Sequence, residues 1–207
     1  MNRRTALLSA VACLAVAPAH AATLSADDTA RVDRAAAYLQ DLASVTGRFT
    51  QTAPNGATST GKIWLQRPGK ARFQYDAPVR MSIVSNGRRV GLWDGRLNTF
   101  NTAPLSRTPL NLLLAKHVRL DRGVDIARVD ANSEGFALTA VDHAHPSDGR
   151  IVIYFADKPM ALTGWNLTDA NGRTTRVRLG RLAPASGLDP DLFALRDPRR
   201  SGEPPQR

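Results

Sequence analysis

Cysteine and glutamate are almost missing from this chain of 207 residues. The only cysteine, Cys13, lies in an apolar stretch near the N-terminus that we expect to be cleaved off. The mature chain would then form no disulfide and use no thiolate chemistry. Only two glutamates are present, Glu134 and Glu203. A mechanism with paired carboxylates would therefore depend on aspartates, most of which lie where turns or helix caps account for them.

Long apolar runs are absent after the first 21 residues, which argues against a later membrane-spanning helix. Two arginines precede the N-terminal apolar stretch and the triplet Ala19-His20-Ala21 follows it, which is the pattern of a secretory signal peptide. We therefore predict a signal peptide over residues 1–21 and a soluble mature chain that begins at Ala22. Export by the twin-arginine route and lipoprotein cleavage at Cys13 are the less favoured alternatives.

Acidic residues are fewer than basic ones. The chain has 18 Asp and Glu but 28 Lys and Arg, which gives a formal net charge of +10. Loss of residues 1–21 removes two arginines and no acid, which leaves +8. The predicted export and the scattered arginines argue against a nucleic acid as partner. A basic surface outside the cytoplasm suits anionic membranes or acidic protein partners, and a basic surface without a specific partner is an equal alternative.

Two helices are predicted from the spacing of apolar residues. The first begins after Ser25, with acidic residues in its first turn, and is expected to end near Gly47. The second begins at Thr108-Pro109, where threonine would cap the helix and proline would occupy its first position. Both helices are amphipathic or apolar, so each can cover an apolar surface.

Nearly everything else is expected to be β-strand. Short runs of alternating apolar and polar residues are separated by tight turns such as Asn86-Gly87, which is typical of an antiparallel meander. We predict a mainly β fold of about ten or eleven strands in one domain over residues 22–197. The Pro-rich, charged segment 198–207 is expected to be a disordered tail.

One face of the predicted sheet carries most of the large apolar side chains, because side chains alternate along a strand. Such a face must be covered, either by closure of the sheet into a barrel or by helices packed on it. Positions three and four apart on the second helix share a face that can serve as this cover. The side chains expected in the apolar interior are those of Phe49, Ile63, Leu65, Phe73, Tyr75, Ile83, Val90, Leu92, Leu110, Leu113 and Leu114.

The stretch GKIWLQRPGK contains a charged exception to this pattern. Arg67 falls on the same strand face as Ile63 and Leu65, one position before a proline. A guanidinium has five N–H donors and needs acceptors wherever it is shielded from water. Arg67 is therefore a candidate functional residue.

Candidate catalytic chemistry is thin elsewhere. The stretch DHAHPSD places His143 and His145 on one side of an extended segment, with Asp142 and Asp148 nearby, and all are possible zinc ligands. The spacing is not distinctive, so we expect a solvated loop without a metal. No phosphate-binding loop or nucleophile elbow is present, and we predict no catalytic residue. A metal-dependent hydrolase remains the alternative from another functional class.

The segments GRFTQT, GKIWLQRPGKARFQYDAP, SIVSNGRRVGLWD and TPLNLLL, in this order and spacing, resemble the LolA family of periplasmic outer-membrane lipoprotein carriers. The resemblance is strong from about Arg48 to Ala115 and continues more weakly to about Asp197. It implies an unclosed antiparallel β-barrel whose helices form a lid over an apolar cavity. Aromatic residues make up only 6% of the chain, so we expect mainly aliphatic side chains around that cavity.

The resemblance also implies a non-enzymatic function that needs no cofactor. A carrier of this family takes the acyl chains of lipoproteins from an inner-membrane ABC transporter and delivers them to an outer-membrane acceptor. Arg67 matches the family's arginine that holds the empty carrier closed through carbonyls of the lid helices, so it is the predicted lid latch. We expect a monomer in the periplasm. A carrier or sensor of another lipid or amphiphile is the alternative among binding proteins.

Overall fold

The computed structural model describes residues 24–118, 120 and 123–201, so the predicted signal peptide lies outside the described residues. Helix α1 (Ala26–Asp41) begins as predicted, because the Ser25 side chain accepts a hydrogen bond from the backbone N–H of Asp28. It ends earlier than predicted. The chain leaves the helical conformation at Leu42, and strand β1 starts at Ser44. The β-branched residues of the sequence SVTGRFTQT favour a strand and outweigh the helical spacing there.

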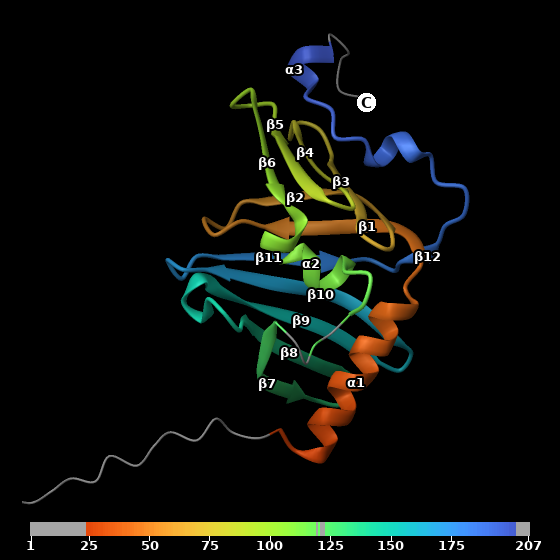
Figure 1. Ribbon diagram of the computed structural model, residues 1–207, viewed down its shortest axis with the longest axis vertical. Helices are drawn as coiled ribbons and strands as arrows, with labels where there is room; N and C mark the ends of the chain where they lie inside the picture. The colour runs from red at the N-terminus through yellow and green to blue at the C-terminus, as the bar shows by residue number, and fades with distance from the viewer. Residues whose placement is uncertain (1–23, 119, 121–122, 202–207) are drawn as a thin grey trace, which may run out of the picture.

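Within the described residues, twelve strands form one sheet, and each of their pairings is antiparallel (Figure 1). The predicted mainly β, unclosed fold is confirmed, because the strand order β6-β5-β4-β3-β2-β1-β11-β10-β9-β8-β7 leaves β6 and β7 as separate edges. Only the short β12 lies off this path, paired with β1. The strands are β1 (Ser44–Thr52), β2 (Thr58–Gln66), β3 (Lys70–Tyr75), β4 (Met81–Asn86), β5 (Arg89–Asp94), β6 (Thr99–Pro104), β7 (Val124–Ala131), β8 (Gly135–Asp142), β9 (Gly149–Asp157), β10 (Met160–Asp169), β11 (Thr174–Leu179) and β12 (Ala183–Pro184).

The sheet consists of two meanders that meet at β1. Strands β1 to β6 pair in sequence order, and so do β7 to β11. The register of β1 with β2 runs from Ser44 to Thr52, but β1 meets β11 only from Phe49 to Thr52. The two halves are therefore joined by a short ladder.

The connection between the two meanders contains the second helix. It begins with the short 3-10 helix η1 (Leu105–Arg107) and continues into α2 (Leu110–Leu114), which is only five residues long. The expectation of a second substantial helix is wrong. The hydroxyl of Thr108 donates to the carbonyl of Leu105 in the preceding turn instead of capping α2. Across the described residues, we find no helix long and apolar enough to cross a membrane.

Three further helical turns occur later in the chain. They are η2 (Pro146–Asp148), η3 (Pro190–Phe193) and α3 (Pro198–Ser201). The last of these occupies the first four residues of the segment 198–207, which we expected to be a disordered tail. Asp197 precedes this turn and forms ion pairs with Arg199 and Arg200, which the sequence alone did not suggest.

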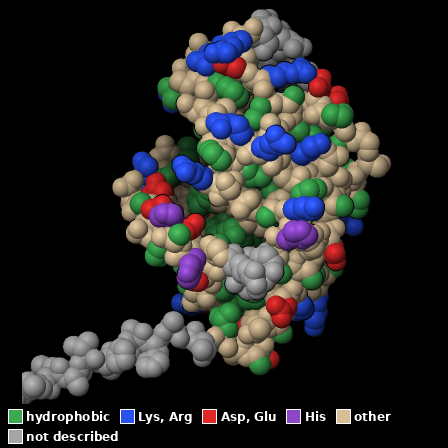
Figure 2. Space-filling model, viewed as in Figure 1, with side chains coloured by type: hydrophobic (Ala, Val, Ile, Leu, Met, Phe, Trp, Pro, Cys, Tyr) green, Lys and Arg blue, Asp and Glu red, His purple; other side chains and the backbone are tan. Residues whose placement is uncertain are grey.

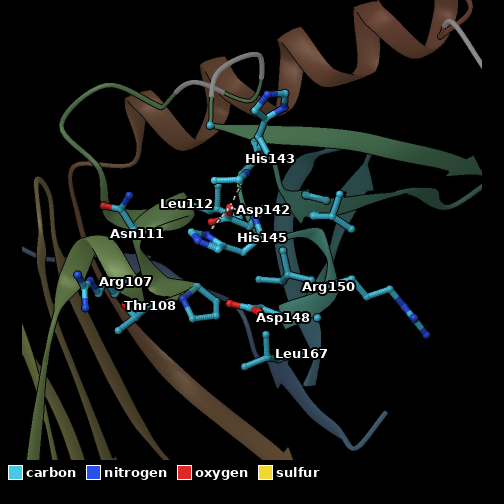
Figure 3. Close-up of a pocket in the computed structure, with 18 of the residues that line it drawn as sticks. Arg107, Thr108, Asn111, Leu112, Asp142, His143, His145, Asp148, Arg150 and Leu167 are labelled. Atoms are coloured by element: carbon cyan, nitrogen blue, oxygen red, sulfur yellow. Dashed lines mark hydrogen bonds and ion pairs between the residues drawn. The ribbon is translucent and has the colours of Figure 1, made fainter. Parts of the chain in front are cut away.

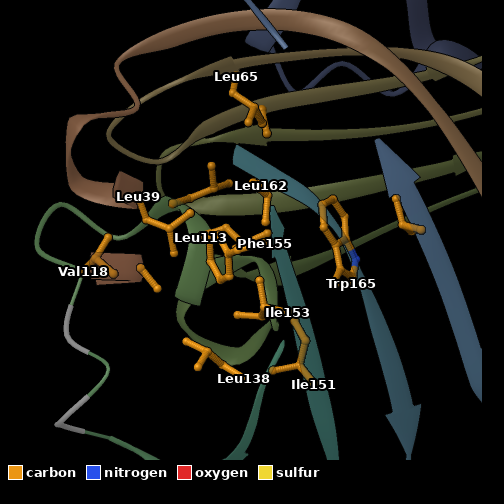
Figure 4. Packing of buried hydrophobic residues seen from close by; sticks show 14 of the residues in the cluster. Leu39, Leu65, Leu113, Val118, Leu138, Ile151, Ile153, Phe155, Leu162 and Trp165 are labelled. Carbon is orange, nitrogen blue, oxygen red and sulfur yellow. The ribbon is translucent and has the colours of Figure 1, made fainter. Parts of the chain in front are cut away.

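Helices α1 and α2 pack on one face of the sheet and enclose the main core with it (Figure 4). Leu39 of α1 and Leu113 of α2 lie beside Phe155 and Leu162 of the sheet. The core is mostly aliphatic, but it also holds edge-to-face aromatic pairs, with ring centroids 5.6 Å apart for Phe49 and Phe73. Side chains of both helices and of the sheet pack together in this core.

The C-terminal segment covers part of the opposite face. The Arg72 side chain points away from the core, since it alternates with the buried Ala71 and Phe73, and it donates to the carbonyl of Leu192 over 3.2 Å. At Gly91 a β-carbon would lie 2.7 Å from the Leu195 side chain, so the C-terminal segment approaches the backbone of β5 closely there.

Candidate functional site

Arg67 lies directly after β2, where the chain turns towards β3, and its side chain reaches both helices. Nη1 donates to the carbonyl oxygen of Leu39 in the last turn of α1, and to that of Leu113 in α2 over 2.9 Å. Nη2 donates to the carbonyl oxygen of Ala115, just after α2, over 2.6 Å. One guanidinium therefore joins the β2–β3 turn to both helices.

The chemistry of these three carbonyls explains why an arginine is found there. The last carbonyls of a helix lack intrahelical partners and carry partial negative charge, so a cation is favourable beside them. Burial lowers the pKa of the Arg67 guanidinium from its usual value, yet arginine stays protonated in proteins. Its Nε is buried without a hydrogen-bond partner among the described residues. The two terminal nitrogens of the guanidinium are thus hydrogen-bonded, whereas Nε has no acceptor among the described residues.

The backbone of the same turn adds two bonds, one to the segment that follows α1 and one to α2. The N–H of Arg67 donates to the carbonyl of Ala43 over 2.7 Å, and the N–H of Gly69 donates to that of Leu114 over 2.8 Å. Gly69 has a φ of +80°, and a β-carbon there would lie 2.6 Å from the Cα of Gly87. Glycine is therefore required where this turn approaches the turn between β4 and β5.

Gln40 connects the two helical segments to each other. Its Nε2 donates to the carbonyl of Lys116 over 3.1 Å, and its Oε1 accepts from the N–H of Val118 over 3.0 Å. No pattern in the sequence indicates this role, because a glutamine on an amphipathic helix is normally a solvated surface residue. Helix α1 and the segment after α2 are thereby fastened together independently of Arg67.

The apolar residues predicted to line the interior occupy the packed core beneath the two helices, with one exception. Leu113 and Leu114 of α2 are buried, while Leu110 is only partly buried. On the sheet, buried side chains are those of Phe49, Ile63, Leu65, Phe73, Tyr75 and Val90, and Ile83 packs against them.

Leu92 differs from the expected interior position. The register pairs Leu92 with Ile83, so Leu92 lies on the face of the sheet that carries the core. Its side chain is nevertheless 37% exposed. Strand β5 is second from the free edge of the sheet, and there the side chain lies outside the packed core.

An open cleft of about 1050 Å³ borders this core (Figures 2 and 3). It lies between the η1–α2 segment and the ends of β8, β9 and β10. Its apolar lining includes Leu112, Ala140, Ile151 and Leu167, and Figure 2 shows a hydrophobic hollow flanked by histidine and charged side chains. Ala140 and Ile151 also belong to the core, so the cleft and the packed interior are continuous. None of the residues predicted to line the cavity is among those that line this cleft.

The candidate zinc ligands lie on the rim of the cleft (Figure 3). Nδ1 of His143 lies 2.9 Å from a carboxylate oxygen of Asp125, and that hydrogen bond raises the pKa of His143. Nδ1 of His145 lies 3.4 Å from an oxygen of Asp142. Both histidines are exposed, and the described residues contain no group of three or more His, Cys, Asp or Glu arranged for a metal.

Replacing His143 and His145 together with alanine is expected to change little. Surface substitutions away from packed groups shift the free energy of unfolding by about 0.5 kcal/mol or less. Chemical unfolding and metal analysis of the purified protein test this expectation. Loss of a stoichiometric zinc ion together with ligand binding in the double variant would contradict it.

Gln40→Ala is expected to loosen the segment after α2 without unfolding the protein. A side-chain hydrogen bond contributes about 1 kcal/mol, so the Val118 amide should exchange its hydrogen about fivefold faster. Gln40→Glu is the matched control, since it keeps the acceptor for Val118 and loses the donor to Lys116. Hydrogen exchange measured by NMR should place it between the wild type and the alanine variant. Equal rates in all three proteins would argue against the fastening role.

The open sheet, the two fastened helices and the apolar cleft with a polar rim are the features of a binding protein for ligands with an apolar part. The sequence profile described as "Outer membrane lipoprotein carrier protein LolA" matches residues 40–196. The chain therefore belongs to the LolA family.

Individual relatives cover most of the chain at low identity. An outer-membrane lipoprotein carrier protein of Methylococcus capsulatus is 28% identical over 180 residues, which cover 83% of this chain and 86% of the relative. One of Methylibium petroleiphilum is 28% identical over 206 residues, with 95% and 96% covered.

Solved structures with a likeness to the chain include an uncharacterized conserved protein of Thermus thermophilus. Its TM-score is 0.48 at 9% identity, over 82% of this chain and 94% of that protein. A LolA superfamily protein of Nitrosomonas europaea has a TM-score of 0.42 at 11% identity, over 77% and 97%. The family assignment rests on the sequence matches.

Proposed function

We propose that this protein is a periplasmic carrier that binds the acyl chains of lipoproteins and takes them from the inner to the outer membrane. An inner-membrane ABC transporter would supply the cargo, and an acceptor on the outer membrane would receive it. Membership of the LolA family and the names of the relatives support this proposal. The protein acts by binding and release, without catalysis or a cofactor.

The observation that carries the proposal is the set of contacts made by Arg67. An acyl chain gains about 0.8 kcal/mol for each methylene group that it buries, so a lipid with long chains would stay trapped in an open apolar groove. Release requires a closed state that competes with the cargo. Hydrogen bonds from one guanidinium to carbonyls at Leu39, Leu113 and Ala115 stabilise such a state.

Binding of cargo would replace the contacts that the helices make with the sheet. In the closed state the side chains of α1 and α2 fill the interior, so acyl chains enter only as the helices move away from the sheet. The cleft beside α2 is the proposed point of entry, because its apolar lining continues into the core at Ala140 and Ile151. Its polar rim suits the hydrophilic part of the cargo.

The test is to purify the mature chain from the periplasm and identify its bound molecules by mass spectrometry. Acylated lipoproteins in stoichiometric amount are the expected result. Free lipids alone would replace the proposal with a carrier of another amphiphile, and a bound metal with hydrolytic activity would replace it with an enzyme.

A further inference from the structure

Because the sheet is not closed, its two terminal strands in the described part of the chain have a free edge. Strands β6 and β7 each pair with one neighbour only, and the short β12, paired with β1 alone, has just two residues. The unpaired N–H and C=O groups of an edge strand are a template for another extended chain, and proteins usually protect such edges. The two edges of this sheet differ sharply in how they are protected.

Charged side chains on the β7 edge are paired with one another or with a neighbouring turn. Arg128 and Asp130 form an ion pair within the strand, with Nε of the arginine 2.6 Å from the carboxylate. Asp125 is paired with His143 of the neighbouring turn. Charged side chains that are already paired make this edge a poor site for another chain.

The β6 edge, in contrast, belongs to a segment with a large excess of positive charge. Residues 79–107 contain five arginines and one acid, Asp94. The Asp94 carboxylate caps its own turn by accepting from the N–H groups of Arg96 and Leu97. Within the described chain, none of the five arginines forms an ion pair, and four of them lack any side-chain hydrogen bond: Arg80, Arg88, Arg96 and Arg107.

These arginines are placed around the edge strand. Arg96 lies just before β6 begins, and the carbonyl of Arg88 accepts from Leu105, directly after β6 ends. The face shown in Figure 2 carries a row of Lys and Arg side chains on the half of the molecule that contains β5 and β6 in Figure 1. Arg80 and Arg96 lie with Asp94 at the end where β6 begins, and Arg88 lies at the other end, so positive charge is in excess at both ends.

The same hairpin carries exposed apolar side chains. Leu92 of β5 and Leu97 of the β5–β6 turn, which is 55% exposed, are the large hydrophobic residues that stand out to solvent in the described part of the chain. A free strand edge, unpaired arginines and exposed leucines thus occur together on one hairpin. A partner would cover the free edge and the exposed leucines, and the arginines favour a partner of negative charge.

We propose that the free edge of β6 binds an extended, acidic segment of a partner protein, which adds to the sheet as a further strand. The backbone groups of β6 would pair with the segment, and acidic side chains near its ends would meet Arg88 and Arg96. A lipid surface is a poorer match, since it offers no row of donors and acceptors. Leu97 would also offer a membrane only a single strongly exposed apolar side chain.

The first experiment measures binding of a fluorescent eight-residue peptide of alternating glutamate and valine to the mature chain by anisotropy. The double variant Arg88→Glu/Arg96→Glu is expected to bind it at least tenfold more weakly. Arg128→Glu/Arg176→Glu changes the net charge equally, away from β6, and is the matched control, expected to stay within twofold of wild type. Absence of binding to the wild type, or equal losses in both double variants, would overturn the proposal.

The second experiment separates strand addition from charge attraction. The same peptide with alternate backbone nitrogens methylated keeps its charges but cannot complete a ladder, so two such peptides, one for each phase, are compared. At least one should bind tenfold more weakly than the parent. Equal binding of all three peptides, preferential binding to anionic vesicles, or dimerisation through β6 would contradict the proposal. The assay uses no lipoprotein, so its outcome is independent of the proposed carrier function.

Discussion

Arg67→Leu is expected to give a protein that folds, takes up lipoprotein and fails to release it. Leucine suits a position next to Ile63 and Leu65, so the sheet should form as in the wild type. The closed state would lose the side-chain bonds to Leu39, Leu113 and Ala115, whereas the open, loaded state would lose little. The backbone bonds of Arg67 to Ala43 and of Gly69 to Leu114 would remain.

The size of this effect follows from the charge on the guanidinium. A hydrogen bond to a charged group contributes about 1.5–3 kcal/mol. Loss of two or three such bonds therefore shifts the equilibrium from the closed towards the open state by a factor of about a hundred or more. The variant should therefore accumulate in the periplasm as a loaded complex. A transfer assay, in which purified loaded carrier is mixed with outer-membrane acceptor, measures the release directly.

Arg67→Lys is the control that keeps the positive charge but not the planar guanidinium. An ammonium group retains the positive charge but lacks the planar fork that reaches three carbonyls, so its release rate should be intermediate. If both variants released cargo at the wild-type rate, Arg67 would have a structural role only.

Leu113→Asp is expected to cause the largest loss of stability among the lid substitutions. The Leu113 side chain is 5% exposed and lies beside Phe155 and Leu162. Loss of its packing alone would cost about 2–5 kcal/mol. The buried carboxylate adds a desolvation cost unless α2 leaves the sheet. Denaturant unfolding should show a lower midpoint, and hydrogen exchange should show α2 detached.

Leu112→Asp is the matched control on the same helix. Leu112 is partly exposed and lines the cleft, so an aspartate there remains in contact with water. Its free energy of unfolding should fall by much less than that of Leu113→Asp. Equal losses for the two variants would contradict the assignment of Leu113 to the lid contact.

The strands were more predictable from the sequence than the helices. Strand alternation and turns such as Asn86-Gly87 are local signals, and the meanders that they predict are present. The end of α1 was placed too late because helical spacing continues into residues whose pairing with β2 decides their conformation. At α2, Thr108 has a helix-capping sequence, but its hydroxyl bonds to the preceding turn.

The candidate site was only partly predictable for a similar reason. A charged residue on an apolar strand face draws attention to Arg67, but its carbonyl partners lie 28 to 48 positions away in the sequence. Their position was implied by family resemblance alone. Gln40 carries no local signal, and the cleft brings together segments 106–117 and 140–151, which only the fold makes adjacent. The role of Arg67 as a latch stays a prediction.

The short ladder between β1 and β11 sets an order of assembly. It joins Phe49 to Leu179, whereas every other ladder between the main strands links consecutive segments of the chain. Local hairpins form early, and contacts between distant residues form late and slowly. We expect the two meanders to form separately. Strand β1 would then have one side unpaired until β11 pairs with it. During folding, the unpaired and aggregation-prone edge would therefore be β1, the strand that lies in the middle of the finished sheet.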